Sequence, residues 1–132
     1  MQSPAPQETV VAIDGPALLF RAYYGAPAVH DTFGLPVGAV IGALRAIADL
    51  VARARGSRFV VVFDAAQRTF RNDIFPAYKA NRGDPPEDLV PQFDRIVKAV
   101  DALGLTTSRL VGYEADDLMA TLARLAREQG LR

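Results

Sequence analysis

The chain has 132 residues, of which 50% are hydrophobic and 23% charged, and its formal net charge is zero. These values are ordinary for one soluble domain with a sizeable core, and no apolar run approaches the roughly 20 residues of a membrane helix. The absence of cysteine excludes disulfides and thiolate metal sites, and a single histidine, His30, argues against a histidine-based catalytic triad. Residues 1–8 lack the features of a signal peptide and are expected to form a disordered lead-in, so the protein is expected in the cytoplasm.

Apolar periodicity and turn residues predict one domain, residues 9–132, in which strands and helices alternate. Short runs rich in Val, Ile and Phe predict buried parallel strands at Thr9–Ile13, Phe59–Phe63 and Thr106–Val111. Helices are predicted at Pro16–Tyr24, Val37–Arg55, Leu89–Leu103 and Glu114–Gln129. Residues 25–36 and 65–86 are predicted to be a loop and an irregular basic stretch. This order indicates an α/β fold with a central parallel sheet and right-handed crossovers.

Five carboxylates follow the predicted strands. Asp14 and Asp64 end the first two apolar runs, and Glu114, Asp116 and Asp117 come after the third. In open parallel sheets the ligand site lies beyond the carboxyl ends of the strands, so these acids are expected to converge. Close carboxylates repel one another, and a hard cation such as Mg²⁺ or Mn²⁺ relieves that repulsion. Each acid alone could simply cap a helix, but a cap does not need three acids in four positions, which favours a metal site.

The charges are unevenly distributed along the chain. Segment Arg53–Arg82 contains seven bases and two acids, whereas Gly83–Asp117 contains eight acids and three bases. A basic segment beside an acidic cluster suits a phosphate substrate held next to a metal site. The alternative is that charged helix faces are merely solvated, and this alternative is favoured for the acids from Asp84 to Asp101.

Aromatic and basic residues interleave in the stretch from Gln67 to Arg82. Arginine binds phosphate through two parallel hydrogen bonds, and an aromatic ring stacks on an unpaired base. Phe70 and Phe75 are interpreted as core anchors of this loop. The segment from Tyr78 through Lys79 to Arg82 is interpreted as functional.

Six motifs in this order resemble the 5′-nuclease domain of bacterial DNA polymerase I, which belongs with the flap endonucleases and phage 5′-exonucleases on a PIN-like fold. The motifs are Val11–Gly15, Phe20–Tyr23, Val61–Asp64, Thr69–Arg71, Tyr78–Arg82 and Gly112–Asp117. The resemblance extends from about Thr9 to Gly130, nearly the whole chain. It implies a Rossmann-like, three-layer fold around the parallel sheet.

The resemblance also implies an activity, that of a divalent-metal-dependent 5′-3′ exonuclease or flap endonuclease that hydrolyses DNA in replication and repair. It implies Mg²⁺ or Mn²⁺ as the cofactor and DNA with a 5′ end or 5′ flap as the partner. The implied metal ligands are Asp14, Asp64, Glu114, Asp116 and Asp117. The implied catalytic residues are Lys79 and Arg21, and the implied DNA-binding residues are Arg68, Arg71, Tyr78 and Arg82.

In the family that the chain resembles, a further strand with a second aspartate group and a helix-hairpin-helix element would follow Arg132. The fold is therefore expected to be truncated. Activity is expected to be weak or absent unless a C-terminal remainder or a partner chain completes the domain. Two alternatives remain, a non-catalytic DNA-binding fragment of the same fold and a PIN-type ribonuclease. The stretch from Tyr78 to Arg82 points away from the ribonuclease.

Overall fold

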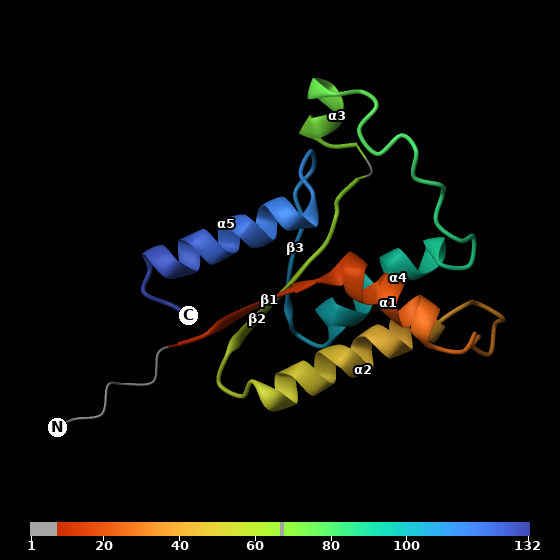
Figure 1. The fold of residues 1–132 in the computed structure, drawn as a ribbon. Helices are drawn as coiled ribbons and strands as arrows, with labels where there is room; N and C mark the ends of the chain where they lie inside the picture. The colour runs from red at the N-terminus through yellow and green to blue at the C-terminus, as the bar shows by residue number, and fades with distance from the viewer. Residues whose placement is uncertain (1–7, 67) are drawn as a thin grey trace.

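The computed structural model describes residues 8–66 and 68–132 and shows helices on both sides of a small parallel sheet (Figure 1). Its elements are β1 (Val10–Asp14), α1 (Gly15–Gly25), α2 (Gly38–Arg53), β2 (Arg58–Val62), α3 (Phe70–Ile74), α4 (Val90–Ala102), β3 (Thr106–Ser108) and α5 (Ala115–Glu128). Residues 1–7 of the predicted lead-in and Gln67 of the basic stretch lie outside the described residues. No helix among the described residues has both the length and the apolar character needed to cross a membrane.

The sheet has the order β1-β2-β3, and both pairings are parallel. Ile13 pairs with Val61 in the first ladder, and Val62 pairs with Ser108 in the second. Because parallel strands point the same way, their carboxyl ends meet at one edge, which is where the acids were predicted to gather. The predicted α/β class and parallel sheet are confirmed.

Strand β3 is shorter than predicted, because the prediction ran to Val111 and the strand ends at Ser108. The apolar residues beyond it form a turn in which the Tyr113 N–H donates to the Leu110 carbonyl. Gly112 has a φ of 89°, in the left-handed region that favours glycine. Leu110 and Val111 are exposed, so this apolar run carries a turn and not a buried strand. All other predicted boundaries lie within two residues of the observed ones.

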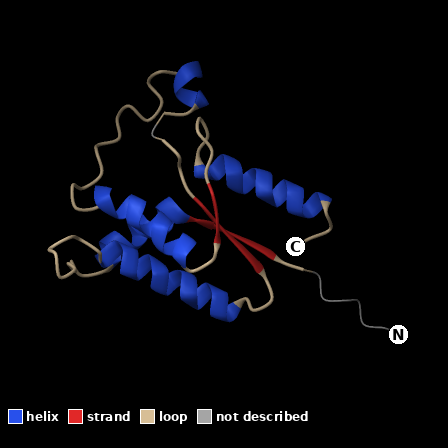
Figure 2. Cartoon of the chain, turned by 180° about the vertical axis from the view of Figure 1, so that it is seen from behind, coloured by secondary structure: helices blue, strands red, loops and turns tan. Residues whose placement is uncertain are grey.

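The helices form two outer layers. Helix α5 covers one face of the sheet, whereas α1, α2 and α4 cover the other, as Figures 1 and 2 show from opposite sides. Apolar side chains from the sheet and from these three helices make the core, which is centred on Leu19, Ile47, Val61, Ile96 and Val100. The predicted apolar faces are largely right, but Ala48 of α2 and Leu103 after α4 are exposed.

Gln92 in α4 is a buried polar residue that caps another helix. Its side-chain Oε1 accepts hydrogen bonds from the N–H groups of Ala39 and Val40, at 2.9 and 3.2 Å. Its Nε2 donates to the Asp88 carbonyl at 2.9 Å. Residue Val37 at the start of α2 has no side-chain oxygen to cap these donors. Gln92 therefore satisfies the N-terminus of α2 from across the core.

The basic stretch is more ordered than predicted, because it contains the short helix α3. Thr69 is buried and its Oγ1 accepts from the Arg71 N–H, while the Asn72 Oδ1 accepts from the Thr69 N–H, which is a capping box. The prediction that Phe70 and Phe75 anchor the core is wrong, since they are 38% and 61% exposed. Helix α3 lies beyond the carboxyl ends of the strands, away from α1, α2 and α4 (Figure 1).

The last residue of the chain lies along β1. The Arg132 N–H donates to the Glu8 carbonyl at 2.9 Å, and the Val10 N–H donates to the Arg132 carbonyl at 2.7 Å. This is the pattern of a parallel bridge, on the side of β1 opposite to β2.

Candidate active site

Two of the predicted acids lie at the ends of neighbouring strands. Asp14 is the last residue of β1 and pairs in register with Val62 of β2. Asp64 comes two residues after Val62, just beyond the level of Asp14. The Asp14 Oδ1 accepts from the Ala17 N–H at 2.9 Å and caps α1. The capping interpretation is therefore correct for Asp14. Capping engages only part of the acceptor capacity of an ionised carboxylate.

Asp64 connects the end of β2 to the start of α5. Its Oδ1 accepts from the Ala115 N–H at 2.7 Å, although the two residues are 51 positions apart in the sequence. The N–H groups of a first helical turn have no partner within the helix. They therefore donate to a carboxylate and favour its negative charge at this position. The contact brings Asp64 to the start of α5, next to whose first residue, Ala115, stand Glu114 and Asp116 in the sequence.

Asp117 is held by Arg71 through two parallel hydrogen bonds. The Arg71 Nη1 and Nη2 atoms lie 2.7 and 2.6 Å from the two carboxylate oxygens. Asp117 Oδ2 also accepts from the Glu114 N–H at 3.0 Å. The hydrogen bonds from Arg71, aided by its charge, lower the pKa of Asp117 to about 2 and raise the pKa of the guanidinium. Asp117 is thus firmly ionised.

Glu114 is held by Lys79 and Tyr78. The Lys79 Nζ lies 2.8 Å from the Glu114 Oε1, and the Tyr78 hydroxyl donates to Oε2 at 3.4 Å. Arg71 adds a longer ion pair of 3.7 Å to the same carboxylate. Burial lowers the pKa of the Lys79 ammonium, but the hydrogen bond to Glu114 and its negative charge outweigh burial and raise the pKa above its ordinary value.

The all-oxygen donor set suits a hard divalent cation, but the side chains are not arranged as a ready metal site. Among residues 8–66 and 68–132, no group of three or more His, Asp or Glu side chains is placed to hold a metal ion. One oxygen of Asp64 accepts from the Ala115 N–H, and Glu114 and Asp117 are paired with cations of the chain itself. The metal-binding role of the five acids stays a prediction.

Tyr78 and Lys79 reach the acids because the segment before them is anchored at two points. The Phe70 N–H donates to the Gly112 carbonyl at 2.8 Å, and the Asn72 Nδ2 donates to the Tyr78 carbonyl at 3.1 Å. Sequence reasoning missed Thr69 and Asn72 as supports of the site. The spacing Thr-x-x-Asn, which resembles a capping box, was the available signal.

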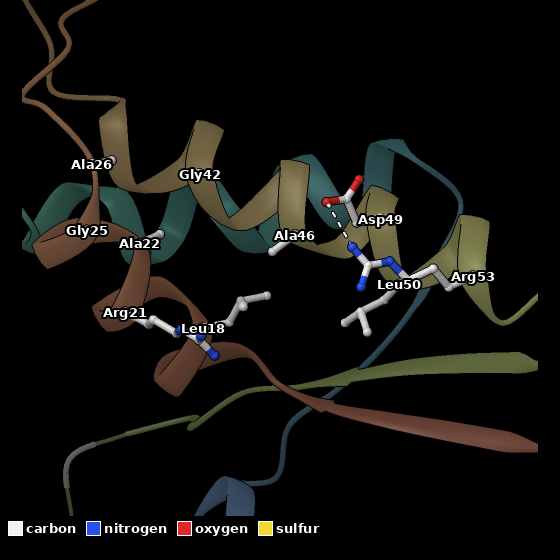
Figure 3. Close-up of a pocket in the computed structure, with 10 residues that line it drawn as sticks. All are labelled: Leu18, Arg21, Ala22, Gly25, Ala26, Gly42, Ala46, Asp49, Leu50 and Arg53. Atoms are coloured by element: carbon white, nitrogen blue, oxygen red, sulfur yellow. Dashed lines mark ion pairs between the residues drawn. The ribbon is translucent and has the colours of Figure 1, made fainter.

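The remaining predicted residues, as the structure describes them, take no part in these contacts. Asp116 is exposed on the first turn of α5, and Arg82 is exposed after a turn closed by its own N–H and the Lys79 carbonyl. Arg68 pairs with Asp73 at 2.6 Å and not with the acidic cluster. Arg21 lines a groove of about 510 Å³ between α1 and α2 (Figure 3).

The arrangement of the elements matches solved phage nucleases. It superposes on bacteriophage T5 5′-exonuclease with bound zinc ions (TM-score 0.62, 20% identity), covering 92% of this chain and 45% of that one. It also matches a T5 flap endonuclease in a pseudo-enzyme–product complex with DNA and metal ions, with a TM-score of 0.60, 22% identity and 93% and 46% coverage. At this identity the likeness defines the fold alone, that of the PIN-like 5′-nucleases.

The sequence comparisons identify the family. The family model for the 5′-3′ exonuclease N-terminal resolvase-like domain matches residues 9–132. DNA polymerase I of Deinococcus radiodurans is 40% identical over 127 residues, which are 96% of this chain and 13% of that protein. A 5′-3′ exonuclease of Bacillus subtilis is 42% identical over 121 residues, 88% of this chain and 40% of the relative. The chain belongs to the 5′-3′ exonuclease family and spans less than half the length of these relatives.

Proposed function

We propose that this chain provides the N-terminal part of a divalent-metal-dependent nuclease that hydrolyses phosphodiester bonds at the 5′ ends or 5′ flaps of DNA, as in replication and repair. Membership of the 5′-3′ exonuclease family supports the reaction class. The single observation that carries the proposal is the hydrogen bond from Ala115 to Asp64, because it joins the carboxyl end of β2 to the acidic start of α5.

The proposed ligands of Mg²⁺ or Mn²⁺ are Asp14, Asp64, Glu114, Asp116 and Asp117. When bound, such a cation supplies an activated water and neutralises charge on the phosphate. Lys79 and Arg21 are the proposed catalytic residues, and the Lys79 ammonium would offset the charge that builds on the phosphate. Arg68, Arg71 and Arg82 would bind phosphates, and Tyr78 would stack on a base.

The test is cleavage of a fluorescent duplex with a 5′ flap, in Mg²⁺ or Mn²⁺, by the wild type and by Asp64→Asn. Asparagine keeps an oxygen for the Ala115 N–H but loses the negative charge, so the fold should survive. We expect the rate to fall by about 100-fold or more, the order seen when one charge-stabilising group is removed. Glu128→Gln at the end of α5, where the exposed Glu128 pairs with Arg124, is the matched control and should cleave normally. Robust cleavage by both Asp64→Ala and Lys79→Ala would contradict the proposed site.

A non-catalytic DNA-binding role is the second candidate. It is favoured by the ion pairs that hold Glu114 and Asp117, since carboxylates in this arrangement are not free for a cation. On this proposal the chain binds 5′-flap DNA without turnover, and the affinity falls steeply with salt because phosphate contacts release counterions. Binding that is undiminished at high salt would count against it. An RNA flap of the same sequence tests the ribonuclease alternative.

A further inference from the structure

We propose that Arg71 and Lys79 are internal counter-cations of the acidic cluster, and that a divalent cation must compete with them for Asp117 and Glu114. The inference rests on the proposed function, because it takes these carboxylates as cation ligands. It explains why acids at one sheet edge do not form a ready metal site among the described residues.

Two of the three acids at the start of α5 are each held by a cation of the chain. Arg71 holds both oxygens of Asp117, and Lys79 holds Glu114, at distances of 2.6 to 2.8 Å. The side chains of these four residues are only 13 to 35% exposed, so water screens the pairs less than at an open surface. The two cations reduce the repulsion between the neighbouring negative charges, which is the effect that a bound divalent ion would also have.

The segment that carries the two cations can release them without unfolding the core. Lys79 has a φ of 57°, a conformation that costs energy for a residue with a side chain. The segment is anchored to the β3–α5 turn by Thr69 and Phe70, which do not depend on the acids. Breaking the ion pairs would therefore free the Arg71 and Lys79 side chains while the backbone of α3 stays attached.

The competition has a functional consequence by linkage. A DNA phosphate that draws Arg71 and Lys79 away leaves Asp117 and Glu114 to the divalent cation, and the cation in turn leaves the two bases to the phosphate. Substrate and cation should therefore strengthen each other's binding, because reciprocity is required between two ligands that compete with the same internal contact.

The test measures Mn²⁺ binding to the chain by titration calorimetry, without DNA, in the wild type and in Arg71→Gln and Lys79→Gln. Each substitution removes one competing positive charge, so each should raise the Mn²⁺ affinity by about three- to tenfold, the size expected for one charge near a partly exposed site. Arg124→Gln is the matched control. It removes the same charge from α5, but Arg124 pairs with the exposed Glu128 near the other end of the helix, so the affinity should change by less than about twofold.

The outcomes separate this inference from the proposed function. Mn²⁺ binding that is equal in the wild type and both variants overturns the counter-cation inference and leaves the metal site standing. Absence of Mn²⁺ binding in every variant overturns both. Lys79→Gln lies outside the capping box of α3, so it decides the question if Arg71→Gln does not fold. Arg71→Lys keeps the charge but loses the bidentate contact, so its Mn²⁺ affinity should rise less than that of Arg71→Gln.

Discussion

Gly15 leaves space for an aromatic ring beside the candidate site. A Cβ atom built on Gly15 would lie 2.3 Å from the Phe63 Cε1, which is far inside the distance at which real atoms meet. Phe63 is buried and directly precedes Asp64. The Asp14-Gly15 pair at the junction of β1 and α1 therefore reflects packing as well as chemistry, because only glycine admits this ring against the start of α1.

Gly15→Ala should lower the free energy of unfolding by about 2 kcal/mol, the usual cost of overpacking a core. Urea unfolding measures the change. Gly83→Ala is the matched control, because no atom lies within 4 Å of a Cβ built there, and its stability should be unchanged or slightly higher. If the clash is the cause, Phe63→Leu in the Gly15→Ala background should recover part of the loss. A Gly15→Ala variant as stable as the wild type would refute the packing argument.

Gln92 should matter more for stability than any exposed polar residue. Gln92→Leu keeps much of the side-chain volume but leaves the N–H groups of Ala39 and Val40 buried without a partner. We expect a loss of about 2 kcal/mol in the free energy of unfolding, the penalty of unsatisfied buried donors. Thermal or urea unfolding is the measurement, and Gln129→Leu at an exposed position is the control, expected within about 0.5 kcal/mol. Equal stability of the two variants would contradict the capping role.

The Arg71–Asp117 pair should make stability depend on acid. The pKa of Asp117 is about 2 in the folded chain and 3.8 ordinarily, so its contribution is present above about pH 4 and is lost as pH falls through about 2. With solvent screening we expect about 1 kcal/mol. Urea unfolding should therefore separate the wild type from Asp117→Asn at about pH 6 and show little difference near pH 2. Asp73→Asn, which breaks the exposed pair with Arg68, is the control and should change the free energy of unfolding at about pH 6 by less than about 0.5 kcal/mol.

At the scale of elements, apolar periodicity was a sufficient guide wherever burial decides the structure. The observed bounds follow the predicted ones closely for two strands, β1 and β2, and for three helices, α2, α4 and α5. In each of these elements the apolar side chains are the ones that pack against the rest of the molecule. Helix α3 was missed because it has only five residues, none of them buried, and depends on the capping by Thr69 and Asn72. The apolar run after Ser108 was mistaken for strand because its backbone forms a turn and leaves Leu110 and Val111 exposed.

The sequence predicted at which edge of the sheet Asp14 and Asp64 lie, but it did not predict which cations pair with the acids of α5. Asp14 and Asp64 follow strands, so the sheet edge at which they lie could be deduced from topology. The contact of Arg71 with Asp117 joins residues 46 positions apart, and it depends on how a mostly exposed segment docks on α5. No local pattern specifies that docking. The DNA-binding role of Arg71 stays a prediction, and its contact with Asp117 was not anticipated.

At the scale of the whole molecule, the two edges of the sheet differ in what they offer to other strands. On the outer side of β1, the described residues Glu8 and Val10 hydrogen-bond with Arg132. Backbone direction alternates along a strand, so the N–H and C=O of Ala12 face the same side. An extended segment that runs parallel to β1 beyond the level of Arg132 would meet these two groups, because the edge of a sheet accepts a further strand. The bridge made by Arg132 thus fixes both the direction and the register in which such a segment would add to β1.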